Sequence, residues 1–308
     1  MSTMSPELVL PATIERFELG EGPVWDPVRQ HLLWVDITRG LVLTGRLDRE
    51  GHVTVVDSVA VDRTVGAVAV SESGEWIVAG ANRLFIRQAS GRIVPGRRLV
   101  AEGGRRRLND GKPDPSGSFV VGTLSYEPGS ASEELIRVDA VSAMQTIDRD
   151  LGQSNGLAWS VDNKIFYNVD SDRRVVFRRA YDSDARTFGP REVHITVTEG
   201  VPDGLCVDAE DCLWVALWGV GKVVRYAANG LITDSVNVPA PHTSSVAFAG
   251  LDREVLIITT ARFGLTQEEL AGSPTSGSLF SFIPRTPGHP ISLWNANSGE
   301  SPYPKDRK

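Results

Sequence analysis

Short runs of apolar and β-branched residues, separated by polar turns, recur along the whole chain. Examples are residues 32–37, 76–79, 119–123, 165–169, 213–217 and 255–260. Each run is rich in strand-forming residues and bounded by turn residues, which is typical of β-strands. Helical periodicity is almost absent; one helical turn is expected near residues 266–270, where Thr266 can cap it with Glu269 three residues on. The pattern predicts an all-β protein.

The predicted strands fall into units that repeat along the sequence. The residues that open successive units are Gly22, Gly66, Gly111, Gly156, Gly204 and Ser245, at intervals of 44, 45, 45, 48 and 41 residues. Each unit continues with a turn, a second strand and often a third. Such a period, with three or four strands per unit, is typical of a β-propeller, whose closed ring leaves no long bare edges. An open β-sandwich does not explain six units at such regular intervals.

We therefore expect residues 1–308 to form a single six-bladed β-propeller domain, with four-stranded antiparallel blades around a central channel. An N-terminal strand, roughly residues 12–17, is expected to pair into the last blade and close the ring.

The charge and the apolar runs of the chain argue against nucleic acids and membranes as binding partners. The formal charge is −7, and the only dense basic cluster, residues 105–107, is too short for a nucleic-acid-binding stripe. No apolar run approaches ~18 residues, and the N-terminus lacks the pattern of a signal peptide. We expect a cytoplasmic protein that binds neither nucleic acid nor membrane, as a monomer or weak homo-oligomer. Cys206 and Cys212 flank one predicted hairpin turn; free thiols are expected, with a strained local bridge as the alternative.

The residue before each opening residue occupies an equivalent place in the repeat. These residues are Glu21, Val65, Asp110, Asn155, Asp203 and Ser244. Because the innermost strand of each blade lines the channel, we expect them to ring the axis. Four of the six carry side-chain carboxyl or amide oxygens, whereas Val65 and Ser244 show that the ring tolerates apolar or small residues. A turn-capping role is enough to explain a single Asp-Gly or Asn-Gly pair, but it does not explain four such residues in register around the ring.

Carboxylates that face one another repel and raise each other's pKa, and a bound cation relieves this repulsion. Oxygen ligands suit Ca²⁺, Mg²⁺ or Mn²⁺, and Zn²⁺ also accepts carboxylates. The ring therefore predicts one divalent metal ion in the channel and leaves its identity open.

Four segments carry a resemblance to a known family. They are GEGPVW at residues 20–25, LNDGK-x-DP at 108–115 with Gly-Thr at 122–123, SNGLAWS at 154–160, and PDGL at 202–205 with LWVA at 213–216. In this order they resemble the SMP-30/gluconolactonase/luciferin-regenerating-enzyme family of regucalcin-like sugar lactonases, over about residues 20–280. The family is a six-bladed propeller, in agreement with the repeat count.

The resemblance implies that Glu21, Asn155 and Asp203 hold one divalent metal ion. It also implies that Arg107 and Asn109 contact the sugar, and that Glu127 is an acid on the lid loop, residues 125–134. This loop varies across the family. Two further departures are Leu124, where many members have Met, and the turn residues 211–212, where Gly and a polar residue are usual.

The implied reaction is hydrolysis of a small sugar lactone, an aldonolactone such as gluconolactone, to its aldonic acid. The metal would act as a Lewis acid, and Asp203 would be both ligand and general base. Because a ligand carboxylate is a weak base, a water held by the ion is the alternative source of the nucleophile. A phosphotriesterase or other esterase on the same metal site, and a non-catalytic metal-binding or interaction propeller, are the competing functions. Trp218 and His242 are further candidates for the walls of the channel mouth, and Trp218 suits blade packing equally well.

Overall fold

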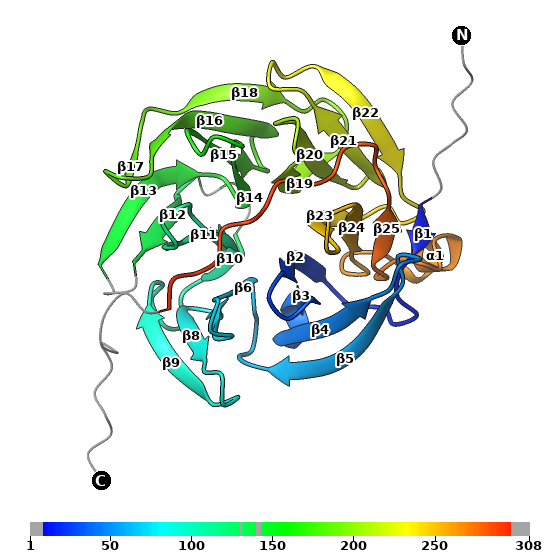
Figure 1. Ribbon diagram of the computed structural model, residues 1–308, viewed down its shortest axis with the longest axis horizontal. Helices are drawn as coiled ribbons and strands as arrows, with labels where there is room; N and C mark the ends of the chain where they lie inside the picture. Colours follow the sequence, from blue (N-terminus) through cyan, green and yellow to red (C-terminus); the bar gives the residue numbers. More distant parts are fainter. Residues whose placement is uncertain (1–8, 128, 130, 140–142, 297–308) are drawn as a thin grey trace.

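The computed structural model describes residues 9–127, 129, 131–139 and 143–296. These residues form six antiparallel sheets arranged as a ring (Figure 1), so the predicted six-bladed β-propeller is confirmed. Within each blade the strands follow one another from the channel outward.

The first three blades are regular four-stranded sheets. Blade one consists of β2 (Gly20–Asp26), β3 (His31–Asp36), β4 (Leu41–Leu47) and β5 (Val53–Ala60). Blade two consists of β6 (Ala67–Val70), β7 (Trp76–Ala79), β8 (Arg83–Arg87) and β9 (Ile93–Arg98). Blade three consists of β10 (Arg106–Pro113), β11 (Phe119–Ser125), β12 (Glu133–Val138) and β13 (Met144–Leu151).

The other blades include two irregular ones. Blade four consists of β14 (Ser154–Trp159), β15 (Ile165–Asp170), β16 (Val175–Asp182), β17 (Thr187–Phe188) and β18 (Glu192–Thr196). Blade five consists of β19 (Val201–Val207), β20 (Leu213–Trp218), β21 (Lys222–Tyr226) and β22 (Ile232–Asn237). Blade six consists of β23 (Thr243–Ala249), β24 (Val255–Thr260), β25 (Phe280–Phe282) and the N-terminal β1 (Leu10–Pro11).

Two details differ from the predicted blade plan. In blade four, β17 and β18 both pair with β16, so the outer edge is split between two short strands. Pro190 lies between them and has no N–H to donate, which interrupts the ladder. In blade six, β1 closes the ring just before the expected segment 12–17. That segment bends away after its start, leaving Ile14 95% exposed.

Apolar side chains fill the junctions between neighbouring blades. The buried residues of the described chain form six apolar clusters, and each combines strands of two adjacent blades. Trp34 and Trp214, among the largest fully buried side chains, lie in two of these junctions. Burying a side chain of this kind contributes roughly 1.5–3 kcal/mol, so the blades are held mainly by packing around the ring.

Outside the sheets there are two short helices in the part of the chain that the structure describes. The 3-10 helix η1 (Ile37–Arg39) follows β3, and α1 (Gln267–Gly272) precedes β25. The predicted cap is present: Thr266 Oγ1 accepts from the Glu269 N–H, and the Glu269 carboxylate accepts from the Thr266 N–H. Neither of these helices has the length and apolar character needed to cross a bilayer.

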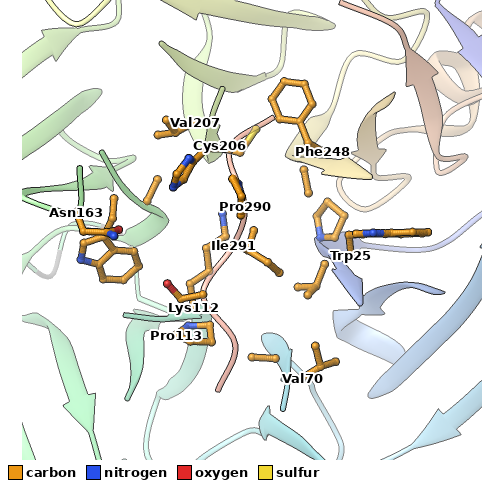
Figure 2. Close-up of a pocket in the computed structure, with 18 residues that line it drawn as sticks. Trp25, Val70, Lys112, Pro113, Asn163, Cys206, Val207, Phe248, Pro290 and Ile291 are labelled. Atoms are coloured by element: carbon orange, nitrogen blue, oxygen red, sulfur yellow. The ribbon is translucent and has the colours of Figure 1, made fainter. Parts of the chain in front are cut away.

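The end of the described chain crosses the ring over one mouth of the channel (Figure 1). Backbone hydrogen bonds join His289 to Val207 on one side and Trp294 to Val70 on the other. Beneath this segment lies an apolar pocket, lined by the last residues of the innermost strands and by Pro290 and Ile291 (Figure 2). The C-terminal segment therefore covers the channel at the end where the innermost strands finish.

Candidate functional site

The predicted channel residues lie at the opposite end, where the innermost strands begin. In five of the six blades the register between the two inner strands shifts at this point. The shifted segments are 21–24, 108–111, 155–157, 202–205 and 243–245. A β-bulge re-aims a side chain, and here it recurs at the equivalent place around the ring.

In three blades, the glycine after the channel residue, Gly66, Gly156 or Gly204, allows close packing against the next blade. A Cβ on Gly156 would lie 2.5 Å from the Asp203 carbonyl oxygen, and one on Gly66 would lie 2.5 Å from the Asn109 carbonyl oxygen. A side chain at these positions would clash with the innermost strand of the next blade. This contact explains the glycine at three of the repeated positions.

Glu21 and Asp203 form a buried carboxyl pair, only 9% and 8% exposed. Their carboxyl groups are close enough to form a hydrogen bond when one of the two carries a proton. Burial, followed by repulsion from Asp110, raises the pKa of Glu21 to about 8. Burial, followed by repulsion from Glu21 and Asp110, raises the pKa of Asp203 well above its usual range. The pair therefore retains a proton at neutral pH when no cation is bound.

Asp110 is the third buried carboxyl at this end of the channel, and burial raises its pKa as well. The Lys112 ammonium opposes this shift, while its Nζ donates to the Leu205 carbonyl at 2.8 Å. Asp110 repels both members of the carboxyl pair, so it belongs to the same electrostatic cluster. The resemblance did not include it among the ligands, although its place in the repeat put it in the ring.

Asn155 joins the cluster through a chain of hydrogen bonds. Arg107 Nη1 donates to Asn109 Oδ1 at 2.6 Å, and Asn109 Nδ2 donates to Asn155 Oδ1 at 2.6 Å. Asn155 Nδ2 donates to Ser171 Oγ at 2.8 Å. The Arg107 guanidinium lowers the pKa of Glu21 and of Asp203, although burial lowers its own pKa. The predicted sugar-contacting pair thus adjoins the predicted metal ligands.

The predicted lid residue Glu127 lies at the surface, where it forms an ion pair with Arg105. Both residues line a polar cavity of about 470 Å³ together with Arg106, Thr123 and Glu134. The neighbouring Tyr126 interacts electrostatically with Arg107. Its backbone N–H donates to Ser125 Oγ, and within the described residues Glu127 forms no hydrogen bond or ion pair with the carboxyl pair.

Trp218 and His242 stack with ring centroids 4.0 Å apart, next to the starts of β19 and β23. His242 Nδ1 lies 3.0 Å from the Phe263 carbonyl oxygen, and burial lowers the pKa of the imidazole. A neutral imidazole stacked on an indole forms a flat apolar surface. Because Trp218 pairs with Val201, the first residue of β19, the two rings lie at the same end of the propeller as the carboxyl cluster.

The donor set suits a divalent cation. Glu21 and Asp203 offer carboxyl oxygens and Asn155 offers an amide oxygen, and the repulsion within the carboxyl pair marks a position where positive charge is favourable. Among the described residues, no group of three or more carboxylate, imidazole or thiol side chains is close enough to hold a metal ion. A cation at this place would therefore rely on two carboxyls and the Asn155 amide oxygen. Cys206 and Cys212 are buried free thiols and lie away from this set.

A sequence model described as the SMP-30/gluconolactonase/LRE-like region matches residues 19–262. The chain belongs to this family. All four segments of the resemblance fall inside the matched range. The chain is 33% identical to regucalcin of Danio rerio over 288 residues, which are 91% of this chain and 94% of that protein. It is 34% identical to a 6-deoxy-6-sulfogluconolactonase of Pseudomonas putida over 277 residues, 88% of this chain and 92% of that enzyme.

Among solved structures, the SMP-30/gluconolactonase fold is matched by a calcium-binding protein, regucalcin, from Agrobacterium tumefaciens. Its TM-score is 0.85 at 27% identity, covering 96% of this chain and 100% of that one. The similarity extends over the whole ring.

Ser171 is the member of the polar cluster that was not predicted from sequence, because it lies in the turn between β15 and β16 and outside the repeated positions. Asp110 was predicted as a channel residue from its register in the repeat, but not as a metal ligand.

Proposed function

We propose that the protein hydrolyses the ester bond of a sugar lactone, with one divalent cation held by Glu21, Asn155 and Asp203. The observation that carries the proposal is the buried Glu21–Asp203 carboxyl pair, beside the buried Arg107, at the end of the channel where the innermost strands begin. The relationship to a 6-deoxy-6-sulfogluconolactonase supports the choice of a sugar lactone as substrate class.

A bound divalent cation would supply positive charge that polarises the lactone carbonyl and stabilises the charge developing on its oxygen. The protein's own residues supply the rest. Asp203 would accept a proton from water as the water oxygen bonds to the carbonyl carbon. The bond between that carbon and the ring oxygen then breaks, and the ring oxygen takes up a proton. One lactone and one water give one hydroxy acid.

Arg107 and Asn109 are suited to orient the sugar. Both N–H groups of Asn109 are used by Asn155 Oδ1 and by the Ser154 carbonyl, so its free capacity is on Oδ1. Arg107 spends Nη1 on the Leu108 carbonyl and on Asn109, which leaves its other donors for a substrate hydroxyl or carbonyl. We expect Asp110, which Lys112 partly neutralises, to shape the field around the cation.

The test is hydrolysis of a panel of aldonolactones by metal-depleted protein and by protein reconstituted with Ca²⁺, Mg²⁺, Mn²⁺ or Zn²⁺. We expect turnover of at least one lactone that depends on the added cation, and its loss in Asp203→Ala and Asn155→Ala. Ser160→Ala, at the far end of blade four, is the matched control. A phosphotriester in the same panel tests the esterase alternative. Absence of lactone hydrolysis with every cation would refute the proposal.

The predicted cytoplasmic location and oligomeric state stay predictions, as does the contact between Glu127 and substrate.

A further inference from the structure

Ser171 lies outside the repeated channel positions, yet it ends the hydrogen-bond chain that begins at Arg107. It is 3% exposed and lies in the turn between β15 and β16. Its Oγ accepts from Asn155 Nδ2 at 2.8 Å and donates to the Pro202 carbonyl at 2.7 Å. Ser171 therefore connects two of the proposed ligand positions, Asn155 directly and Asp203 through the preceding residue.

The direction of every hydrogen bond in this series is fixed by its two ends, the Arg107 guanidinium and the Pro202 carbonyl. A guanidinium only donates, so the oxygen of the Asn109 amide must face Arg107. The Asn109 nitrogen then faces Asn155, which must answer with its own oxygen. The Asn155 nitrogen is left to face Ser171, whose single O–H is used by the Pro202 carbonyl, an acceptor only.

We propose that Ser171 is a positioning residue for the cation site, resting on the proposed function. Its hydroxyl holds the Asn155 amide nitrogen away from the cation, so that the amide presents its oxygen on the other side. The same hydroxyl ties the β15–β16 turn to the backbone next to Asp203. Removing it leaves the Asn155 nitrogen without this acceptor and the Pro202 carbonyl without this donor. The Asn155 amide is then held through its oxygen alone, by Asn109 Nδ2, and its orientation is less tightly fixed.

The experiment is calorimetric titration with Mn²⁺ of the wild type, Ser171→Ala and Ser171→Cys. The matched control is Ser160→Ala, since Ser160 is 2% exposed, lies in the same blade, and bonds through Oγ to Asp162 and to the Ile165 N–H. We expect Ser171→Ala to bind Mn²⁺ about 10- to 100-fold more weakly, as is usual when an outer partner of a ligand is removed. Ser171→Cys, which keeps the shape with weaker hydrogen bonds, should fall between, and Ser160→Ala should match the wild type.

Kinetics separate positioning from loss of folded structure. With a lactone substrate, the deficit of Ser171→Ala should shrink as Mn²⁺ is raised toward saturation, whereas a damaged fold would not recover. If Ser171→Ala does not fold, the Ser171→Cys titration decides. Mn²⁺ affinities of the folded Ser171 variants within about twofold of wild type would overturn the inference alone. A wild-type protein that binds no Mn²⁺ and hydrolyses no lactone would overturn the proposed function itself.

Discussion

Replacing Glu21 by Gln is expected to stabilise the cation-free protein at neutral pH while removing its affinity for the cation. The Glu21 carboxyl is buried, and burial, with repulsion from Asp110, raises its pKa from 4.5 to about 8. Gln keeps the length of the side chain and an oxygen for the Gly22 N–H, which now donates to Glu21 Oε2 at 2.9 Å. It does not titrate.

The magnitude follows from proton linkage. Between pH 4.5 and about 8 the folded state keeps a proton on Glu21 that the unfolded chain releases. The free energy of unfolding therefore falls as pH rises through this window, by about 1.4 kcal/mol per pH unit. This contribution to stability is fully present below pH 4.5 and is lost by about pH 8. At pH 7 the loss amounts to about 3 kcal/mol, and we expect Glu21→Gln to recover most of it.

The assay is urea unfolding in the presence of a chelator at several pH values from 5 to 8. Glu102→Gln, at an exposed carboxylate, controls for the loss of one charge. We expect Glu21→Gln to show a shallower decline with pH than the wild type. Mn²⁺ at about 1,000 times its Kd should reverse the order, because it stabilises the wild type by about 4.1 kcal/mol and only the wild type binds it. A Glu21→Gln protein that is less stable than the wild type in chelator at pH 7 would refute the electrostatic reasoning.

Three other substitutions test packing and charge pairing within the propeller. Gly156→Ala places a Cβ 2.5 Å from the Asp203 carbonyl oxygen, so we expect the free energy of unfolding in urea to fall by about 1–3 kcal/mol and Mn²⁺ binding to weaken. An unchanged Mn²⁺ affinity would show that this close packing between blades does not position Asp203. Arg137→Ala leaves the buried Asp114 carboxylate without the guanidinium whose Nε lies 2.6 Å from it, so the free energy of unfolding should fall by about 3–5 kcal/mol. A fall of less than about 1 kcal/mol, as for an exposed ion pair, would contradict this. Trp294→Ala removes a buried anchor of the segment that crosses the far mouth, and it should lower the free energy of unfolding by about 3–5 kcal/mol without changing Mn²⁺ affinity. Weaker Mn²⁺ binding by the folded variant would contradict this.

The repeated features of this protein were accessible from sequence because symmetry multiplies a weak signal. One Asp-Gly pair such as Asp203-Gly204 is an ordinary turn, but its recurrence at equal intervals predicts both the ring and the residues that face its axis. The Thr266–Glu269 cap was accessible for a different reason: it depends on two residues at a fixed local spacing.

Features that break the repeat were not accessible. Ser171 contacts Asn155 only because the β15–β16 turn folds back over the start of β14, and no periodicity marks a turn residue. The split outer edge at β17 and β18 depends on an irregular segment in the longest repeat. The segment that crosses the far mouth follows the last repeat. Its backbone hydrogen bonds to Val207, Val70 and Gly117 leave no signal in the pattern of side chains.

The proposed cation site consists of Glu21, Asn155 and Asp203. The decisive measurement is calorimetric titration with Mn²⁺ of metal-depleted wild type, Asp203→Asn and Asn155→Ala, with circular dichroism to show that each protein is folded. We expect one bound Mn²⁺ per wild-type chain and a loss of binding in both variants. Equal Mn²⁺ binding by all three folded proteins would contradict it.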